Sequence, residues 1–106
     1  MRAAVRCGEL QIGTWVNLVR NPAILPLLKA AGLDFARADT EHTAASMETI
    51  ANRALLSRAL NFPIVVRPPE ANREWITRLL DCGVWNPYCP QVENAPHAAE
   101  IVAVSR

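Results

Sequence analysis

The sequence predicts an α/β protein in which strands and helices alternate four times around a parallel sheet. Short apolar or β-branched runs begin near residues 11, 34, 63 and 84, and a stretch with helical spacing of apolar residues follows each run. Polar side chains gather directly after the second, third and fourth of these runs. Alternation of this kind forms parallel sheets with right-handed crossovers, so the carboxyl ends of the strands share one edge.

The first strand and the first helix are predicted at residues 11–18 and 21–31. Gly13 in the strand suits a close approach of backbone. The helix starts at an asparagine-proline pair and ends at Gly32. Pro26 either kinks its first turn or shifts its start to a later residue. Residues 1–10 show no clear period and are expected to form a surface lead-in or a short helix.

A second strand at 34–38 leads to the most regular predicted helix, 47–60, which Ser46 can cap. Its apolar residues recur at i, i+3, i+4, i+7 and i+8 and predict one inward face: Met47, Ile50, Ala51, Ala54 and Leu55. The residues expected to face away from the core are Glu48, Asn52 and Arg53.

The second half of the chain repeats the pattern. A β-branched third strand at 62–67 is stopped by two prolines, and a fourth strand at 84–89 is the weakest because Asn86-Pro87 interrupts it. Helices are predicted at 72–82 and 94–104. Their inward apolar residues are Ile76, Leu79 and Leu80 in the former and Ala98, Ile101 and Val102 in the latter. His97 is expected at the surface.

Composition limits the classes of function. The chain of 106 residues, about half of them apolar, is expected to be one domain. Its net charge of +1 and the lack of a basic stripe argue against nucleic acid and anionic membranes as partners. No apolar run approaches the roughly 18 residues of a membrane span, so the cytoplasm is the expected location. Three cysteines without a C-x-x-C pair predict reduced thiols, with Cys82 in the core.

Ionisable side chains follow the buried second strand at its end, where Asp39, Glu41 and His42 lie within four residues. Arg67 ends the third strand, and Gln91 and Glu93 follow the fourth. Because catalytic groups of parallel α/β proteins gather at the carboxyl ends of the strands, these side chains are expected to surround one pocket.

Six ordered blocks of sequence resemble a known family. They are Gln11-Ile12-Gly13-x-Trp15, Ala31-Gly32-x-Asp34-Phe35, Asp39-x-Glu41-His42, Val65-Val66-Arg67-Pro68, Leu79-Leu80-Asp81-x-Gly83 and Pro90-x-Val92-Glu93. In this order they resemble the HpcH/HpaI aldolases, which are class II, metal-dependent pyruvate aldolases. The resemblance implies a TIM (β/α)8 barrel, a fold of about 250 residues. Residues 1–106 would then be the N-terminal half, four βα units, with the C-terminal half absent.

The resemblance also implies an activity and roles for individual residues. The reaction is the reversible retro-aldol cleavage of a 4-hydroxy-2-oxo acid to pyruvate and an aldehyde. His42 matches the catalytic histidine, Asp39 the carboxylate paired with it, and Arg67 the arginine that stabilises the enolate oxygen. Glu41 could orient His42, accept from Arg67 or support a metal-bound water. Trp15 is expected either near the substrate or in packing.

A divalent cofactor, Mg²⁺ or Mn²⁺, is implied by the family, with its ligands on later strands, so no metal ligand is assigned within this chain. The isolated chain is expected to be inactive as an aldolase. Each catalytic role has a non-catalytic alternative. His42 could be a loop histidine that makes a local hydrogen bond, and Arg67 could form a structural salt bridge to Asp39 or Glu41, which is compatible with a catalytic role. Two other hypotheses are a non-catalytic half-barrel that associates with itself or a complementary half, giving a homo-oligomer, and a related CoA-ester lyase.

Overall fold

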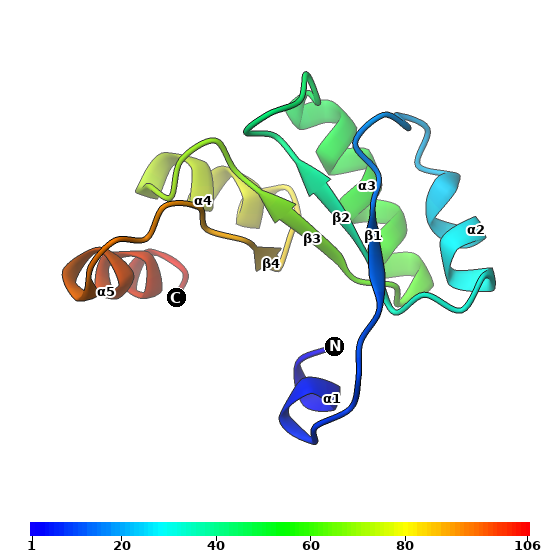
Figure 1. Cartoon of the computed structure of the whole chain (residues 1–106). Coiled ribbons are helices and arrows are strands. Elements are labelled where there is room, and N and C mark those ends of the chain that lie inside the picture. Colours follow the sequence, from blue (N-terminus) through cyan, green and yellow to red (C-terminus); the bar gives the residue numbers. More distant parts are fainter.

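The computed structural model describes all 106 residues, from Met1 to Arg106. Four strands form one parallel sheet in the order β1-β2-β3-β4, and helices alternate with them along the chain (Figure 1). The elements are α1 (Arg2–Arg6), β1 (Gly13–Trp15), α2 (Ile24–Ala30), β2 (Phe35–Asp39), α3 (Met47–Leu60), β3 (Ile64–Arg67), α4 (Arg73–Asp81), β4 (Asn86–Pro87) and α5 (Ala95–Val104). The predicted α/β class, the parallel sheet and the order of the elements are therefore confirmed.

The two faces of the sheet differ in what covers them. Helices α2 and α3 contact β2 and β3, and α4 contacts β4. The residues that point toward these helices are buried and apolar: Ala36, Ala38, Ile64 and Val66. Because side chains alternate along a strand, the intervening residues face the other side of the sheet, where no helix lies over them (Figure 1).

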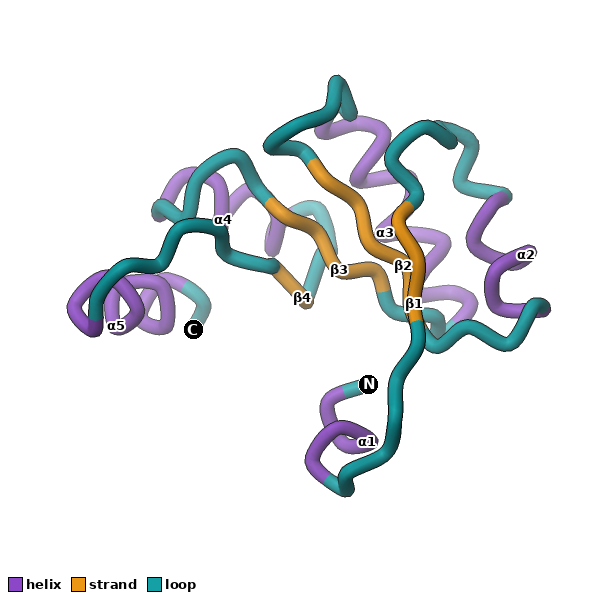
Figure 2. Tube along the Cα trace, in the orientation of Figure 1, coloured by secondary structure: helices purple, strands orange, loops and turns teal.

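The register places the strand ends side by side. Asp39, the last residue of β2, is paired directly with Arg67, the last residue of β3. The loops that follow β1, β2 and β3 lie at the same edge of the sheet (Figure 2). β4 is short, as expected from the interruption at Pro87. The hydrogen bonding to β3 nevertheless continues beyond β4, since the Tyr88 N–H donates to the Val66 carbonyl at 2.7 Å.

The predicted cap of α3 at Ser46 is confirmed, and Asn72 and Asn94 cap α4 and α5 in the same way. The side chains of Ser46, Asn72 and Asn94 each accept from the backbone N–H three residues later. Helix α2, the first of the predicted helices, begins at Ile24 because Asn21 forms a turn with Ala23 ahead of it. This start leaves Pro26 in the first turn, where a backbone N–H has no helical partner.

The predicted inward face of α3 is wrong at two residues. Arg53 is fully buried and Leu55 is 71% exposed. The buried residues are Ile50, Arg53, Ala54 and Ser57, a set at i, i+3, i+4 and i+7 that the core-facing side of the helix requires. Arg53 belongs to this face because its guanidinium donates to the carbonyls of Val16, at 2.9 Å, and Val19 in the loop after β1.

Three further predictions need correction. Helix α5 has no fully buried residue and Val102 is 51% exposed, because α5 packs mainly on α4 and not on the sheet. His97 is half-buried and not a surface residue, since its Nε2 lies 2.8 Å from the carbonyl oxygen of Ala71. Cys82 is half-buried at the end of α4 and borders the core without entering it.

Gly13 occupies a tight contact between β1 and β2. An added Cβ would lie 2.5 Å from the Phe35 ring and 2.6 Å from the Phe35 carbonyl oxygen. The predicted close approach of backbone is thus confirmed. None of the helices in the structure has both the length and the apolar character needed to cross a membrane.

Candidate active site

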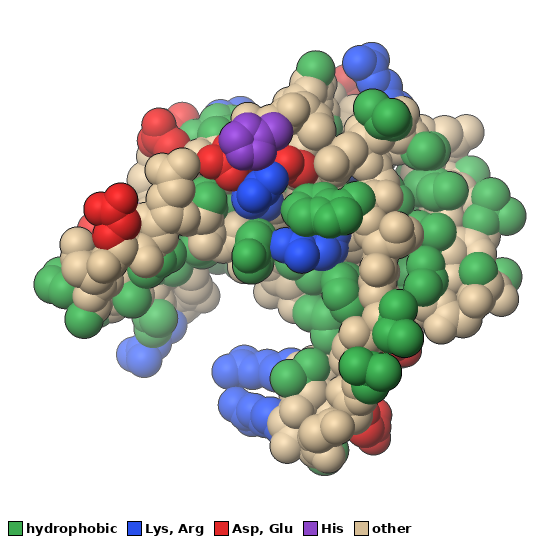
Figure 3. Space-filling view, viewed as in Figure 1, with side chains coloured by type: hydrophobic (Ala, Val, Ile, Leu, Met, Phe, Trp, Pro, Cys, Tyr) green, Lys and Arg blue, Asp and Glu red, His purple; other side chains and the backbone are tan.

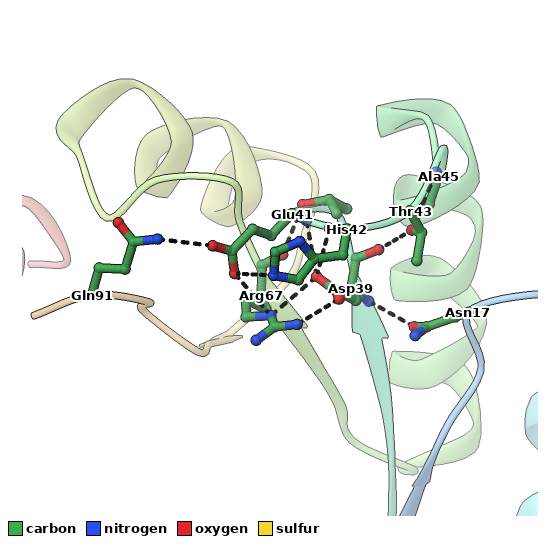
Figure 4. Close-up of polar contacts among 9 residues, drawn as sticks. Asn17, Asp39, Glu41, His42, Thr43, Ala45, Arg67 and Gln91 are labelled. Atoms are coloured by element: carbon green, nitrogen blue, oxygen red, sulfur yellow. Dashed lines mark hydrogen bonds and ion pairs between the residues drawn. The ribbon is translucent and has the colours of Figure 1, made fainter.

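The ionisable residues predicted at the strand ends come together in the structure. Asp39 and Arg67 end neighbouring strands, and Glu41 and His42 follow in the turn after β2 (Figure 4). Acidic, basic and histidine side chains gather at this one place on the sheet face that carries no helix (Figure 3). His42 and Arg67 therefore lie at the same end of the sheet.

Asp39 and Arg67 form a bidentate ion pair. Arg67 Nε lies 3.1 Å from Asp39 Oδ1, and Arg67 Nη2 lies 2.6 Å from Asp39 Oδ2. This hydrogen-bonded guanidinium is the main reason that the pKa of Asp39 is lowered to about 2, although burial of the carboxylate acts in the opposite direction. The same contact raises the pKa of Arg67. Asp39 is therefore a permanent anion that orients Arg67 at neutral pH.

Asp39 also shapes the turn that carries its neighbours. Its Oδ1 accepts from the backbone N–H of Glu41 at 2.9 Å and of His42 at 3.4 Å. Its own N–H donates to Asn17 Oδ1 at 3.1 Å, which ties β2 to the loop after β1. The motif Asp-x-Glu-His thus folds as a side-chain turn at a strand end, and this is why two residues of this turn reach the same site.

Glu41 is the centre of the network. Its Oε2 lies 3.2 Å from Arg67 Nε and 3.5 Å from His42 Nε2. Gln91, which lies in the loop after β4, donates from its Nε2 to Glu41 Oε1 at 3.1 Å (Figure 4). Two of the three possibilities left open for Glu41, orienting His42 and accepting from Arg67, therefore occur together.

The carboxylate beside the His42 ring is Glu41, and this differs from the predicted pairing with Asp39. Asp39 contacts the backbone N–H of His42 and leaves the ring to its neighbour. The His42 side chain is 66% exposed, while that of Glu41 is only 12% exposed. The imidazole is consequently open to solvent on one side and held by a shielded carboxylate on the other.

Trp15 lies beside the network on the same sheet face. The Arg67 guanidinium carbon is 5.5 Å from its ring centroid, and the Arg37 guanidinium carbon is 4.2 Å from it. The ring is 43% exposed, so it packs on the arginines and also borders the open face. Neither Arg37 nor Asn17 was predicted at the site. The signal for Arg37 was a charge at an alternating position inside an otherwise apolar strand.

The chain contains no group of three or more histidine, cysteine, aspartate and glutamate side chains arranged to hold a metal ion. The carboxylates of Asp39 and Glu41 are instead taken up by the Arg67 guanidinium. These residues do not fit a metal site of their own.

A guanidinium held by two carboxylates, with an exposed imidazole next to it, is suited to an anionic carbonyl compound. The fork of Arg67 can stabilise an oxygen that gains negative charge, and the imidazole can move a proton nearby. The fold and the site together thus define a parallel α/β protein with a cluster of ionisable side chains at the carboxyl edge of its sheet.

Comparison with known proteins shows which α/β proteins this chain is similar to. No family model matches the chain. The chain is 34% identical over 105 residues to a 5-keto-4-deoxy-D-glucarate aldolase of Klebsiella pneumoniae, covering 99% of this chain and 41% of the relative. It is 33% identical over 105 residues to a 4-hydroxy-2-oxo-heptane-1,7-dioate aldolase of Shigella sonnei, covering 99% and 40%.

Two solved structures also superpose on the whole chain. An HpcH/HpaI aldolase from Desulfitobacterium hafniense superposes with a TM-score of 0.92 at 30% identity, covering 100% of this chain and 41% of that one. The citrate synthase SbnG superposes with a TM-score of 0.87 at 27% identity, covering 100% and 43%. The chain is related over its whole length to the N-terminal part of the HpcH/HpaI aldolases. It spans about two fifths of the length of the curated relatives it matches.

Proposed function

We propose that this chain supplies part of the active site of an aldolase that cleaves a 4-hydroxy-2-oxo acid reversibly to pyruvate and an aldehyde. The observation that carries the proposal is the cluster of Arg67, Asp39, Glu41 and His42 at one edge of the sheet. The relatedness to aldolases supports the same reaction class.

In the proposed reaction the 4-hydroxyl group loses its proton and the C3–C4 bond breaks. The aldehyde leaves, and the electron pair of the broken bond moves through C3 to the oxygen on C2, which forms the enolate of pyruvate. Protonation at C3 then gives pyruvate. The two demands on the protein are a group that moves the hydroxyl proton and a cation that stabilises the enolate oxygen.

Arg67 meets the second demand. Its Nε and Nη2 are engaged by carboxylates, but Nη1 makes no hydrogen bond within the chain and the side chain remains 24% exposed (Figure 4). The two carboxylates fix the plane of the guanidinium before a substrate arrives, so stabilising a new oxyanion requires little rearrangement.

His42 is the proposed proton carrier. Glu41 Oε2 lies 3.5 Å from its Nε2, close enough to orient the ring. The open side of the ring can face a substrate hydroxyl. We assign Asp39 the task of holding Arg67 and the turn, and Glu41 the task of holding His42; Trp15 borders the substrate. The Mg²⁺ or Mn²⁺ that the resemblance implies stays a prediction, as does the cytoplasmic location.

A chimera tests the proposal. This chain would replace the corresponding N-terminal part of the Desulfitobacterium hafniense aldolase, whose backbone it matches. We expect the chimera to release pyruvate from 4-hydroxy-2-oxo acids in the presence of Mn²⁺. The variant R67M should lower kcat by roughly 100-fold or more, as expected for the loss of a group that stabilises an oxyanion.

The matched control is R78M, because Arg78 is an exposed arginine of α4 whose contacts, Glu74 at 3.7 Å and the Trp75 ring at 5.0 Å, both lie within the same helix. It should leave kcat unchanged. A folded chimera in which R67M and R78M are equally active would refute the role of Arg67. The 106-residue chain alone is expected to release no pyruvate, and turnover by it would show that these residues suffice.

The open sheet supports a second candidate function, a half-barrel that assembles with another chain. β1 and β4 each have only one neighbouring strand. Large apolar side chains are exposed around the sheet, among them Leu10 at 81%, Ile12 at 54% and Trp85 at 67%. Light scattering on the purified chain should then give a mass above that of the 11.7 kDa monomer. A stable monomer at high concentration would count against assembly.

A further inference from the structure

A second arginine lies on the open face of the sheet, close to the proposed catalytic arginine. Arg37 precedes Asp39 by two residues in β2, so both side chains point to the same face. Its direct partners in the sheet are Trp15 on β1 and Val65 on β3. Arg37 therefore lies in an inner strand of the sheet, two residues before the strand end where Asp39 pairs with Arg67.

Two aromatic rings on this face, one from each end of the strand order, contact the guanidinium of Arg37. Its carbon lies 4.2 Å from the centroid of Trp15, which comes from β1, and 4.3 Å from the centroid of Tyr88, which follows β4. Contacts at this distance are favourable cation-π interactions. Trp15 and Tyr88 are 43% and 48% exposed, and Arg37 is only half-buried, so part of the arginine can be reached from solvent.

Unlike Arg67, Arg37 forms no ion pair with a carboxylate of this chain. Arg67 has two carboxylates within 3.2 Å, whereas the contacts of the Arg37 guanidinium are the two aromatic faces. The side-chain hydrogen bonds that arginines donate in this chain come from Arg53 and Arg67, so the N–H groups of Arg37 are free to bind a ligand. A planar fork of this kind matches the two oxygens of a carboxylate.

The two arginines also share one neighbour. Both guanidinium carbons lie over the ring of Trp15, at 4.2 and 5.5 Å from its centroid, so they can be no farther apart than the sum of these distances. A small 2-oxo acid carries its carboxylate directly next to its carbonyl group. One such molecule can place its carbonyl oxygen at Arg67 and its carboxylate toward Arg37.

We infer that Arg37, fixed between Trp15 and Tyr88, is a binding residue for the carboxylate of the 2-oxo acid whose carbonyl oxygen Arg67 receives. The inference rests on the proposed function for the choice of ligand, but the contact itself is a property of this chain. It also gives Trp15 and Tyr88 a task, since the two rings set the plane of the fork before the ligand binds.

Pyruvate binding to the 106-residue chain tests the inference without any turnover. The chain labelled with ¹⁵N would be titrated with pyruvate, and the Nε–H signals of its arginines and the indole N–H of Trp15 would be followed by NMR. We expect the Arg37 and Trp15 signals to shift together and to saturate at one Kd. An Arg37 signal that pyruvate leaves unchanged would overturn the inference, whatever the variants show.

The variant R37M removes the charge and keeps a long side chain between the rings. We expect it to raise the Kd for pyruvate roughly tenfold, the usual scale for losing a charge-assisted hydrogen bond. The matched control is R58M, because Arg58 also stacks on an indole, that of Trp85 at 4.8 Å, but lies away from the site. Equal affinity in R37M and R58M would show that Arg37 is only a packing residue.

The chimera separates this inference from the proposed function. If pyruvate binds at Arg37 but the chimera cleaves no 4-hydroxy-2-oxo acid, the binding site stands and the proposed reaction fails. If the chimera cleaves the substrate and R37M leaves its KM unchanged, the reaction stands and the role of Arg37 fails. A rise of KM in R37M with little change of kcat would support both.

Discussion

The ion pair of Asp39 and Arg67 should make the stability of the fold depend on pH in a way that one substitution removes. The pKa of Asp39 is lowered from 3.8 to about 2, chiefly by the hydrogen-bonded guanidinium of Arg67. One pKa unit corresponds to about 1.36 kcal/mol, so the ionised carboxylate contributes about 2 kcal/mol to the free energy of unfolding at neutral pH. Because the folded state holds the proton less tightly, this contribution is complete above 3.8 and disappears as the pH falls through about 2.

The variant D39N keeps the size of the side chain and an oxygen for the turn, but loses the charge. Urea unfolding followed by circular dichroism should show D39N less stable than the unmodified chain by about 2 kcal/mol at pH 7, with a difference that shrinks towards zero near pH 2. The control is D81N, since Asp81 is exposed and forms no ion pair; it should change little at either pH. A destabilisation by D39N that is equally large at pH 7 and pH 2 would refute the electrostatic reasoning.

Three further predictions concern packing and assembly. G13A should lower the free energy of unfolding by about 2 kcal/mol, because its Cβ would clash with Phe35, whereas G8A should cost only about 1 kcal/mol, since that Cβ meets open space and only the positive φ is strained; equal losses in urea unfolding would contradict this. R53M should accelerate amide hydrogen exchange in the loop after β1, because two backbone carbonyls lose their donor; unchanged exchange at Val19 and its neighbours would show that Arg53 does not hold the loop. R67M should leave the light-scattering mass unchanged, since Arg67 belongs to the inner strand β3 and not to β1 or β4, whose open sides could pair with another chain; a change of mass would link the site to assembly.

Local patterns in the sequence were sufficient to predict the elements that depend on them. Cap residues such as Ser46 and Asn72 form hydrogen bonds to backbone three residues away, so they mark a helix start without knowledge of the fold. The parallel order of strands followed from their alternation with helices. The gathering of His42 and Arg67 at one edge then followed from the polar residues at the strand ends.

Features that depend on distant partners could not be predicted in this way. Arg53 is buried because its guanidinium donates to two backbone carbonyls of the loop after β1. The spacing of apolar residues in a helix does not show that a distant loop will supply such acceptors. The His42 ring lies next to Glu41 and not next to Asp39, whose side chain is paired with Arg67. This arrangement depends on the position of Arg67, which comes from another strand and also contacts Glu41. The contact of Arg37 with Trp15 and Tyr88 joins β2 to β1 and to the segment that follows β4.

Exchange of the methyl protons of pyruvate for deuterium tests the central claim most directly, because it requires the enolate and no aldehyde. In the chimera with the Desulfitobacterium hafniense aldolase, NMR in D₂O should show pyruvate losing its methyl proton signal. R67M should abolish this exchange, while R78M should leave its rate unchanged. Exchange that continues at the same rate in R67M would contradict the claim that the Arg67 guanidinium stabilises the enolate oxygen.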